Sequence, residues 1–160
     1  SSYGILLKEI TDSYMYKNKF YRNTVGIHSE GSIRLIVSHN DFIENGWAVR
    51  ILANSTDNQF LENNFIGNSF DIATNSRQNY NTFNRNYWSN YTGYDLNKDG
   101  IGDVPFRPVR LFSLMAEQNP PTLILLRSFL IDLLDVAERI FPVLTPETLV
   151  DSHPMMHQII

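Results

Sequence analysis

The stretch YDLNKDGIGD, residues 94–103, spaces oxygen-bearing side chains in the manner of a calcium-binding loop. Positions one, three, five and nine of the loop are Asp95, Asn97, Asp99 and Asp103. Gly100 stands at position six, where such a loop turns sharply. Position twelve is Phe106, whereas a calcium sensor of the EF-hand type needs a bidentate acid there. We therefore expect a turn-rich connector in which a structural Ca²⁺ or backbone amides offset the acidic charge, and not a sensor.

A second group of metal-ligating side chains lies at the end of the sequence. It consists of His153, Met155, Met156 and His157. This five-residue stretch holds half of all the Met and His residues of the chain. Thioether and imidazole are soft ligands that suit Cu(I) better than calcium, magnesium or zinc. Copper binding is the resulting hypothesis, and an incidental cluster at a terminus is the alternative.

Both groups follow a repeat of 22 to 23 residues that fills about the first ninety positions. Three apolar columns keep this period: Phe20, Phe42, Phe65 and Trp88; Met15, Val37, Phe60 and Phe83; Ile5, Ile27, Val49 and Ile72. Two asparagine columns keep it as well: Asn18, Asn40, Asn63 and Asn86; Asn23, Asn45 and Asn68. A period of this length is typical of a solenoid.

The residue types indicate a parallel β-helix and not a helical solenoid. The columns are β-branched or aromatic and alternate over short runs such as NQFLENNF, and nothing recurs at helical spacing. We expect the apolar columns to stack inside. We place the asparagines at turns, in left-handed backbone conformation, with hydrogen bonds from rung to rung. His28 aligns with Arg50 and His39 with Glu62, so we interpret both histidines as surface residues.

The character of the chain changes after Trp88. Residues 91–110 form a connector rich in Asp and Gly, and residues 111–160 form a tail that we predict to be helical over much of its length. Between Thr122 and Phe141 the apolar arc is wider than a single packing contact requires. The two interpretations are a capping helix buried on two sides and a surface that docks on another protein.

The composition and charge of the chain argue against a nucleic-acid-binding protein and against a membrane-spanning helix. The chain has 160 residues, a net charge of −4, a pI near 5.5 and no cysteine. Without a lysine or arginine cluster it fits no nucleic-acid partner. No apolar run approaches the roughly 20 residues of a membrane-spanning helix. The sequence starts within a repeat, so we expect it to be the C-terminal part of a longer protein, truncated at its N-terminus.

The stretches NYWSNYTGYDLNKDGIGDVPFRPVRLFS and LLDVAERIFPVLTPETLVDSHPMM resemble the C-terminal part of the NosD family. The resemblance implies a periplasmic, right-handed β-helix protein that accepts copper and passes it to nitrous oxide reductase. It implies partnership with the membrane subunit of an ABC-type transporter and with a copper chaperone, and no catalytic activity. The docking surface on the transporter would then comprise Leu123, Leu126, Phe129, Leu130, Leu133 and Leu134.

Two other functions fit a parallel β-helix. One is a carbohydrate-active lyase, hydrolase or epimerase, which needs clustered carboxylates on neighbouring rungs. Asp41 aligns with Asn64 and Glu44 with Gly67, so the acidic residues do not form a column. The other is a purely structural surface β-helix, which predicts neither soft-metal binding nor a transporter partner.

Overall fold

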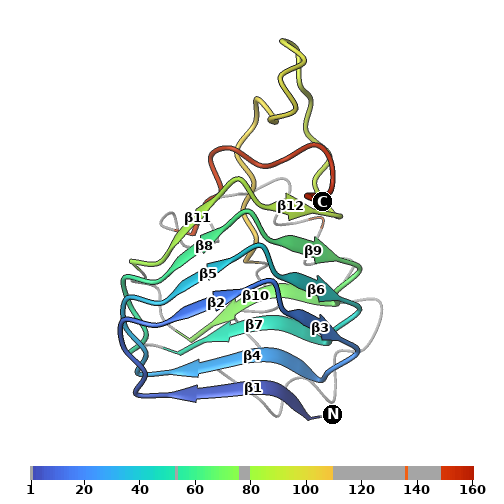
Figure 1. The fold of residues 1–160 in the computed structure, drawn as a ribbon. Helices are drawn as coiled ribbons and strands as arrows, with labels where there is room; N and C mark the ends of the chain where they lie inside the picture. Colours follow the sequence, from blue (N-terminus) through green and yellow to red (C-terminus); the bar gives the residue numbers. More distant parts are fainter. Residues whose placement is uncertain (1, 53, 76–79, 110–135, 137–148) are drawn as a thin grey trace.

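The computed structural model describes residues 2–52, 54–75, 80–109, 136 and 149–160. Within them the chain coils into about four rungs of short parallel strands (Figure 1). The strands are β1 (Tyr3–Lys8), β2 (Tyr14–Tyr16), β3 (Lys19–Tyr21), β4 (Val25–Glu30), β5 (Ile36–Ser38), β6 (Asp41–Ile43), β7 (Trp47–Ile51), β8 (Gln59–Leu61), β9 (Asn64–Ile66), β10 (Phe70–Thr74), β11 (Thr82–Asn84) and β12 (Tyr87–Trp88). The predicted parallel β-solenoid is thereby confirmed for this part of the chain.

Three parallel sheets run along the solenoid. Sheet 1 has the order β1-β4-β7-β10, sheet 2 the order β2-β5-β8-β11, and sheet 3 the order β3-β6-β9-β12. In every sheet each strand pairs with the equivalent strand one rung away. The register therefore follows directly from the period of the sequence.

The predicted apolar columns form the core. The pairing joins Phe20 to Phe42, Phe42 to Phe65, and Phe65 to Trp88. Their rings stack nearly parallel, with centroids 4.9, 4.9 and 4.2 Å apart. Such offset stacking adds about 0.5–1.5 kcal/mol per pair to the gain from burying the rings. A flat aromatic residue therefore suits this column because the rung spacing of a sheet matches the spacing of stacked rings.

The asparagine columns form hydrogen-bonded ladders, as predicted. The Oδ1 of Asn63 accepts from the backbone N–H of Asn40 at 3.0 Å and from its side-chain amide at 3.1 Å. Asn63 in turn donates from Nδ2 to Asn86 Oδ1 at 3.0 Å and to the carbonyl of Val37 at 2.8 Å. Asn63 and Asn86 are fully buried, so these bonds satisfy amides that would otherwise be costly in the core.

The prediction that the asparagines adopt left-handed backbone was wrong. The positive φ angles fall on the residue before each asparagine: Lys17, His39, Glu62 and Arg85 precede one ladder, and Arg22, Glu44 and Gly67 precede the other. The turn thus places a strained residue outside, where its long side chain reaches water. The following asparagine then turns its amide inward to the ladder.

Asp12, Arg34 and Asp57 form a third column of positive-φ residues, and the outward columns pair opposite charges between rungs. Arg34 donates two hydrogen bonds to Asp12, at 2.6 and 2.7 Å, and this contact holds the pKa of the Asp12 carboxyl below its usual value. Arg22 Nε lies 2.6 Å from Glu44 Oε2. Such exposed pairs add little stability individually, but they favour the correct register.

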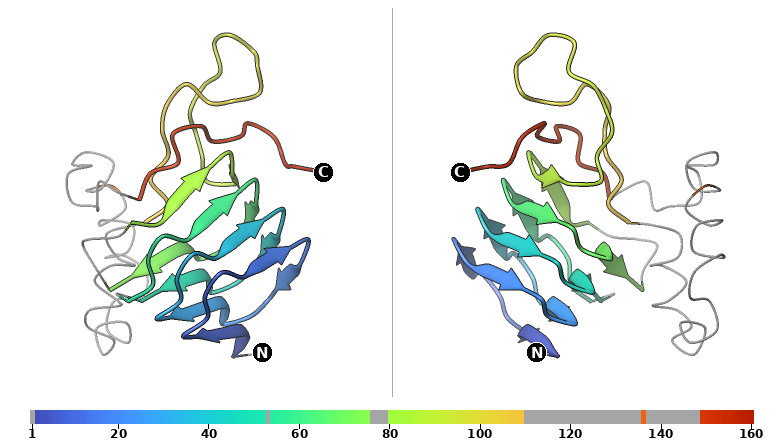
Figure 2. Two further views of the ribbon diagram at one scale, coloured as in Figure 1. Left: turned by 60° about the vertical axis from the view of Figure 1, so that its left-hand side comes forward. Right: turned by 90° about the vertical axis from the view of Figure 1, so that its right-hand side faces the viewer.

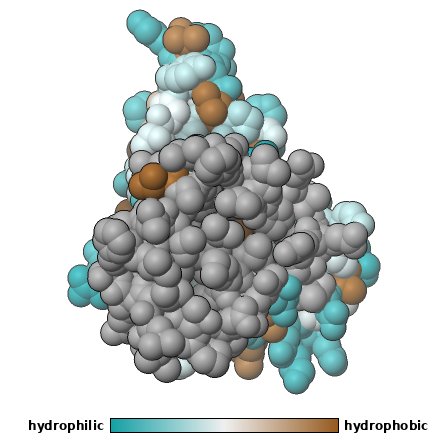
Figure 3. Space-filling view, turned by 180° about the vertical axis from the view of Figure 1, so that it is seen from behind, coloured by the Kyte–Doolittle hydropathy of each residue, from teal (hydrophilic) through white to brown (hydrophobic). Residues whose placement is uncertain are grey.

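Beyond the last rung the connector projects along the solenoid axis, and residues 149–160 cross the same end beneath it (Figure 2). Seen from behind, the connector presents a mixture of hydrophilic and hydrophobic residues (Figure 3). Of the tail predicted to be helical, residues 149–160 are described and contain no helix; the docking residues between 123 and 134 lie outside the described residues. In the described part of the chain no helix has the length and apolar character to cross a membrane.

Candidate functional site

Residues 149–156 form part of a fifth rung at the end of the solenoid. Asp151 makes a parallel bridge to Phe83 and Met155 makes one to Tyr87, which continues sheets 2 and 3. Asp151 also pairs with Phe106 through two backbone hydrogen bonds of 2.8 and 2.9 Å. The C-terminal segment is therefore held in place by both the last rung and the connector.

The buried carboxylate of Asp151 anchors this segment. Its Oδ2 accepts from the backbone and side-chain amides of Asn86 and from Trp88 Nε1, each at 3.0 Å. Its Oδ1 accepts from the backbone N–H groups of Arg85 and His153, each at 3.1 Å. Five donors converge on one carboxylate, so the group is well compensated for its loss of water. The same contacts fix the backbone at His153, the first residue of the predicted copper cluster.

The structure brings the two predicted metal-binding segments together. The carbonyl of Pro154 accepts from the backbone N–H of Gly102 at 2.8 Å, and the carbonyl of Gly100 accepts from that of Met156 at 2.9 Å. Ile101 and Met155 form an antiparallel bridge between these bonds. The Met/His segment consequently lies between β12 and the calcium-like loop, with Met155 paired to Tyr87 on one side and to Ile101 on the other.

Within the Met/His segment, His153 and His157 are exposed, and Met155 and Met156 are half-buried. The Nδ1 of His153 lies 2.9 Å from Asn84 Oδ1. When Nδ1–H donates to this oxygen, Nε2 carries the lone pair and is the nitrogen available to a metal. An imidazole and the thioethers two and three positions further along the chain are ligand types suited to a soft monovalent cation. Copper binding at these four residues stays a prediction.

In the connector, backbone N–H groups donate hydrogen bonds to the acidic side chains. Asp95 accepts from the N–H groups of Asp99 and Gly100, at 3.2 and 2.9 Å. Asp99 Oδ1 accepts from Ile101 at 2.9 Å, and Asp103 Oδ2 accepts from Leu96 at 2.7 Å. These contacts offset the acidic charge in the second of the two ways expected from the sequence. Asn97 belongs to the same network through its contacts with Asp99.

Within the described ranges, no three His, Cys, Asp or Glu side chains gather as a metal site would require. Methionine thioethers are not among these groups, so copper binding by the Met/His segment stays a prediction. Calcium in the connector also stays a prediction.

Tyr91 supports the base of the connector. Its hydroxyl donates to the carbonyl of Val104 at 2.6 Å, and its ring meets Phe106 edge-on at 5.8 Å between centroids. A Cβ added at Gly93 or Gly102 would overlap the Tyr91 ring and hydroxyl, so both glycines are required by this close approach. Burial raises the pKa of the Tyr91 hydroxyl above its usual value of 10.0, against the opposing effect of the Val104 hydrogen bond.

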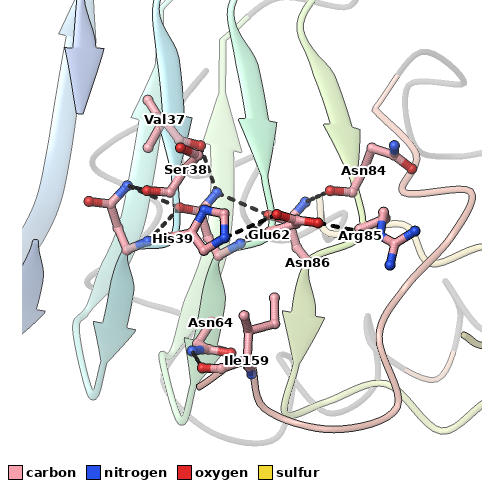
Figure 4. A network of polar contacts seen from close by, with 11 residues as sticks. Val37, Ser38, His39, Glu62, Asn64, Asn84, Arg85, Asn86 and Ile159 are labelled. Atoms are coloured by element: carbon pink, nitrogen blue, oxygen red, sulfur yellow. Dashed lines mark hydrogen bonds and ion pairs between the residues drawn. The ribbon is translucent and has the colours of Figure 1, made fainter. Parts of the chain in front are cut away.

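The last residues of the chain lie against sheet 3. The side-chain amide of Asn64 binds the backbone of Ile159 in both directions, donating to its carbonyl at 2.9 Å and accepting from its N–H at 2.8 Å. Figure 4 shows this pair below a charged column in which Glu62 lies between His39 and Arg85. His39 Nε2 is 3.1 Å and Arg85 Nε 3.5 Å from the Glu62 carboxylate. The Asn64 side chain therefore makes the two hydrogen bonds to the Ile159 backbone that a neighbouring strand would otherwise make.

Three acidic residues of the described rungs are engaged by side chains of neighbouring rungs. Asp41 accepts from Asn64 Nδ2 at 2.8 Å, Glu44 pairs with Arg22, and Glu62 pairs with His39 and Arg85. Each carboxylate thus has a structural partner in a neighbouring rung. The alignments predicted for Asp41 and for the two histidines are confirmed by the register and contacts. The interpretation of His28 as a surface residue was wrong, because it is buried.

Sequence reasoning did not single out Asp151, Asn84 or the Asn64–Ile159 contact. All three join segments 65 to 95 residues apart in the sequence, so no period reveals them. One signal was present for Asp151. The final asparagine of a ladder needs an acceptor, and an aspartate after the last rung is the simplest candidate.

Comparisons with known proteins show the family of this chain. Residues 1–93 match the family model described as "Periplasmic copper-binding protein (NosD)". The chain is 31% identical to the "Probable ABC transporter binding protein NosD" of Pseudomonas aeruginosa over 97% of its own length. It is also 31% identical to the protein of the same name from Stutzerimonas stutzeri, again over 97% of its length. In both cases it spans 40% of the relative.

Proposed function

Because this chain belongs to the NosD family of periplasmic copper-binding proteins, we propose that it binds Cu(I) and hands it over during the maturation of nitrous oxide reductase. In this role copper is a cargo, received from a copper chaperone and passed to the reductase. The protein acts by binding, not by catalysis, and the paired carboxylates of its rungs agree with that.

We propose that the Cu(I)-binding site consists of His153, Met155, Met156 and His157. The observation that carries this proposal is the contact between His153 Nδ1 and Asn84 Oδ1, which directs Nε2 away from the solenoid. Metal-ligating histidines commonly use one ring nitrogen for such an orienting hydrogen bond. His153 and His157 are exposed, so these two ligands are accessible to a donor and an acceptor protein, as transfer requires.

An anaerobic Cu(I) competition titration against a chromophoric chelator tests whether this site binds Cu(I). We expect the full chain to compete for about one Cu(I), as one set of soft ligands would. A variant with alanine at His153, Met155, Met156 and His157 should not compete. A His39→Ala variant is the matched control, because it removes an imidazole that pairs with Glu62 outside the segment.

An intermediate variant makes the test sharper. Asn84→Ala keeps all four ligands but removes the orienting acceptor, so we expect a loss of about 10- to 100-fold in Cu(I) affinity. Equal Cu(I) affinity in the full chain and the four-alanine variant would disprove the proposed copper site. The structural β-helix would then be the better description of this part of the protein.

We further propose that the protein docks on the membrane subunit of an ABC-type transporter through Leu123, Leu126, Phe129, Leu130, Leu133 and Leu134. The names of the relatives and the wide apolar arc of the sequence support this proposal. Binding to the transporter in lipid nanodiscs should be lost in Leu130→Glu. Asp135→Ala, on the polar side of the same stretch, should bind normally. Normal binding of Leu130→Glu would place the docking surface elsewhere.

A further inference from the structure

The Asn64 side chain binds the backbone of Ile159 through two hydrogen bonds. Its Oδ1 accepts from the N–H of Ile159 at 2.8 Å, and its Nδ2 donates to the carbonyl of the same residue at 2.9 Å (Figure 4). Nδ2 also donates to Asp41 Oδ1 at 2.8 Å. The carboxylate of Asp41 therefore fixes the orientation of the amide, and both hydrogens of Nδ2 are used. We term the pair of Asn64 and Ile159 the clamp.

Asn64 belongs to neither asparagine ladder. It precedes the inward-facing Phe65 on β9, so its side chain points out of sheet 3. At the equivalent position of the first rung Lys19 is exposed, whereas Asn64 is only 6% exposed. An asparagine in this outward column does not hold the rungs together. Its hydrogen-bonding groups are instead used on the segment 157–160.

The clamp and Asp151 hold the segment of the four copper ligands at its two ends. Asp151 stands two positions before His153, is fully buried and accepts five hydrogen bonds. Ile159 stands two positions after His157 and is held by the two bonds to Asn64. The two ends are thus held unequally. The end at His157 is the weaker one, because fewer hydrogen bonds must break for it to open.

His157 depends on this weaker attachment. It lies in a bend between Met156, whose N–H is bonded to the connector, and the clamp at Ile159. Its imidazole is exposed and has no hydrogen-bond partner among the described residues, whereas Asn84 orients the imidazole of His153. The position of His157 is therefore set by the backbone on either side of it.

We propose that Asn64 is a positioning residue for the copper site: by holding Ile159 it keeps His157 within reach of the other ligands, and its release lets His157 leave first. This inference rests on the copper site of the proposed function. A transfer site must hold its cargo and also give it up, and a ligand set with one firm end and one releasable end does both. Copper stays on the His153 side while His157 moves aside, which opens a coordination position to the acceptor.

The surroundings of the clamp favour its release. Asn64 and Ile159 line an open hollow of about 210 Å³ together with charged side chains of three rungs, among them Lys17, His39 and Glu62. Water in this hollow can replace the two hydrogen bonds when the clamp opens. The clamp therefore opens at lower cost than a contact in the core.

Amide hydrogen exchange in the copper-free chain, followed by NMR, tests the clamp itself. We expect the amide of Ile159 to exchange at least about tenfold faster in Asn64→Ala than in the natural chain. The amide of Met155, which is bonded to the last rung, should keep its protection and so verifies that this end of the solenoid is intact. Asn23→Ala, in a ladder on the first rung, is the matched control and should leave Ile159 unchanged. Equal exchange of Ile159 in all three forms would overturn the proposal.

The rate of Cu(I) release tests whether the clamp acts through His157. The Cu(I)-loaded chain is mixed with an excess of a chromophoric chelator, and the transfer is followed by absorbance. We expect Asn64→Ala to release Cu(I) about tenfold faster than the natural chain. Ile159→Pro should do the same, because it removes the N–H that Asn64 binds and leaves every residue of the solenoid in place.

A double variant separates positioning from a merely structural role. Asn64→Ala combined with His157→Ala should release Cu(I) no faster than His157→Ala alone, because the clamp then has no ligand to hold. Independent effects of the two substitutions would overturn the proposal and leave the copper site standing, as would unchanged release in both Asn64→Ala and Ile159→Pro. Absence of Cu(I) binding in the natural chain would instead disprove the copper site, and the positioning role of Asn64 with it.

Discussion

Asp151 Oδ2 accepts a 3.0 Å hydrogen bond from the side-chain amide of Asn86 and so takes the place that the next asparagine holds in earlier rungs. The last asparagine of a ladder has donors pointing beyond the rung. An aspartate can only accept when ionised, so it satisfies those donors without presenting a new one. The ladder therefore ends on a residue of a different type for a definite chemical reason.

Replacing Asp151 by asparagine should destabilise the fold. One carboxylate oxygen would become an NH₂ group facing the donors of Arg85 and His153 or those of Asn86 and Trp88. We expect the free energy of unfolding to fall by about 1–3 kcal/mol, the cost of leaving buried donors unsatisfied. Urea unfolding followed by circular dichroism measures it. Asp57→Asn, at an exposed turn, should change stability little, and an equal effect there would contradict the prediction.

Two positions of one asparagine ladder should differ in sensitivity. Asn63 is fully buried and bonds to both neighbouring rungs, whereas Asn18 lies exposed on the first rung. We expect Asn63→Ala to lower the free energy of unfolding by about 2–3 kcal/mol and Asn18→Ala by less than about 1 kcal/mol. Thermal unfolding of the two variants side by side provides the comparison. Similar losses in the two variants would mean that burial does not increase the contribution of a ladder asparagine to stability.

Gly102→Ala should disturb the connector through Tyr91. The added Cβ would overlap the Tyr91 ring, and either the ring or the backbone must move, at about 1–3 kcal/mol. Combining it with Tyr91→Ala makes room, so the double variant should lose less than the sum of the single ones. Unfolding measurements on the complete cycle give this coupling. Strict additivity would show that the two residues do not meet in solution.

Tyr91 should also make stability depend on alkaline pH. Burial favours the neutral phenol and raises its pKa in the folded state above the usual 10.0. Its contribution is thus fully present below pH 10 and is lost as pH rises through the folded pKa. The stability difference between the natural chain and Tyr91→Phe should therefore shrink above pH 10. Unfolding at a series of pH values, with phenolate absorbance recorded alongside, tests this, and a difference that does not change with pH would refute it.

Removal of divalent cations should leave the connector in place. Backbone amides already occupy the carboxylates of Asp95, Asp99 and Asp103, so their repulsion is offset without a cation. We expect EDTA followed by excess Ca²⁺ to change Tm by less than about 1 °C, corresponding to a few tenths of a kcal/mol. The Asp99→Ala variant is the control that shows whether a larger change in Tm with Ca²⁺ arises from binding at this loop. A rise of several degrees with Ca²⁺, lost in that variant, would establish the structural calcium site instead.

The sequence predicted what is periodic and missed what is not. Phe20, Phe42, Phe65 and Trp88 were assigned correctly because the rung spacing repeats the same environment every 22 to 23 residues. The left-handed positions were assigned one residue too late. Asparagine is the usual non-glycine residue there, but in this fold its amide is needed inside the ladder.

The candidate site was less predictable for a physical reason. His153 is oriented by Asn84, 69 positions away, and the Asp151 that fixes its backbone is itself held by Asn86, 65 positions away. The types of the metal-ligating residues were visible in the sequence. Their placement against Gly100 and Ile101 depends on the path of the chain around the end of the solenoid, which no local pattern encodes.

The asparagine ladder has a direction, because each Oδ1 receives donors from the rung before and each amide donates to the rung after. Every rung therefore presents the same two hydrogen-bonding surfaces to its neighbours. A whole rung can therefore be inserted or removed between two others without leaving an amide of the ladder unmatched. Asp151, the connector and the Met/His segment would be unaffected by such a change. The reach of the protein and the chemistry at its tip can thus be adjusted separately, by evolution or by design.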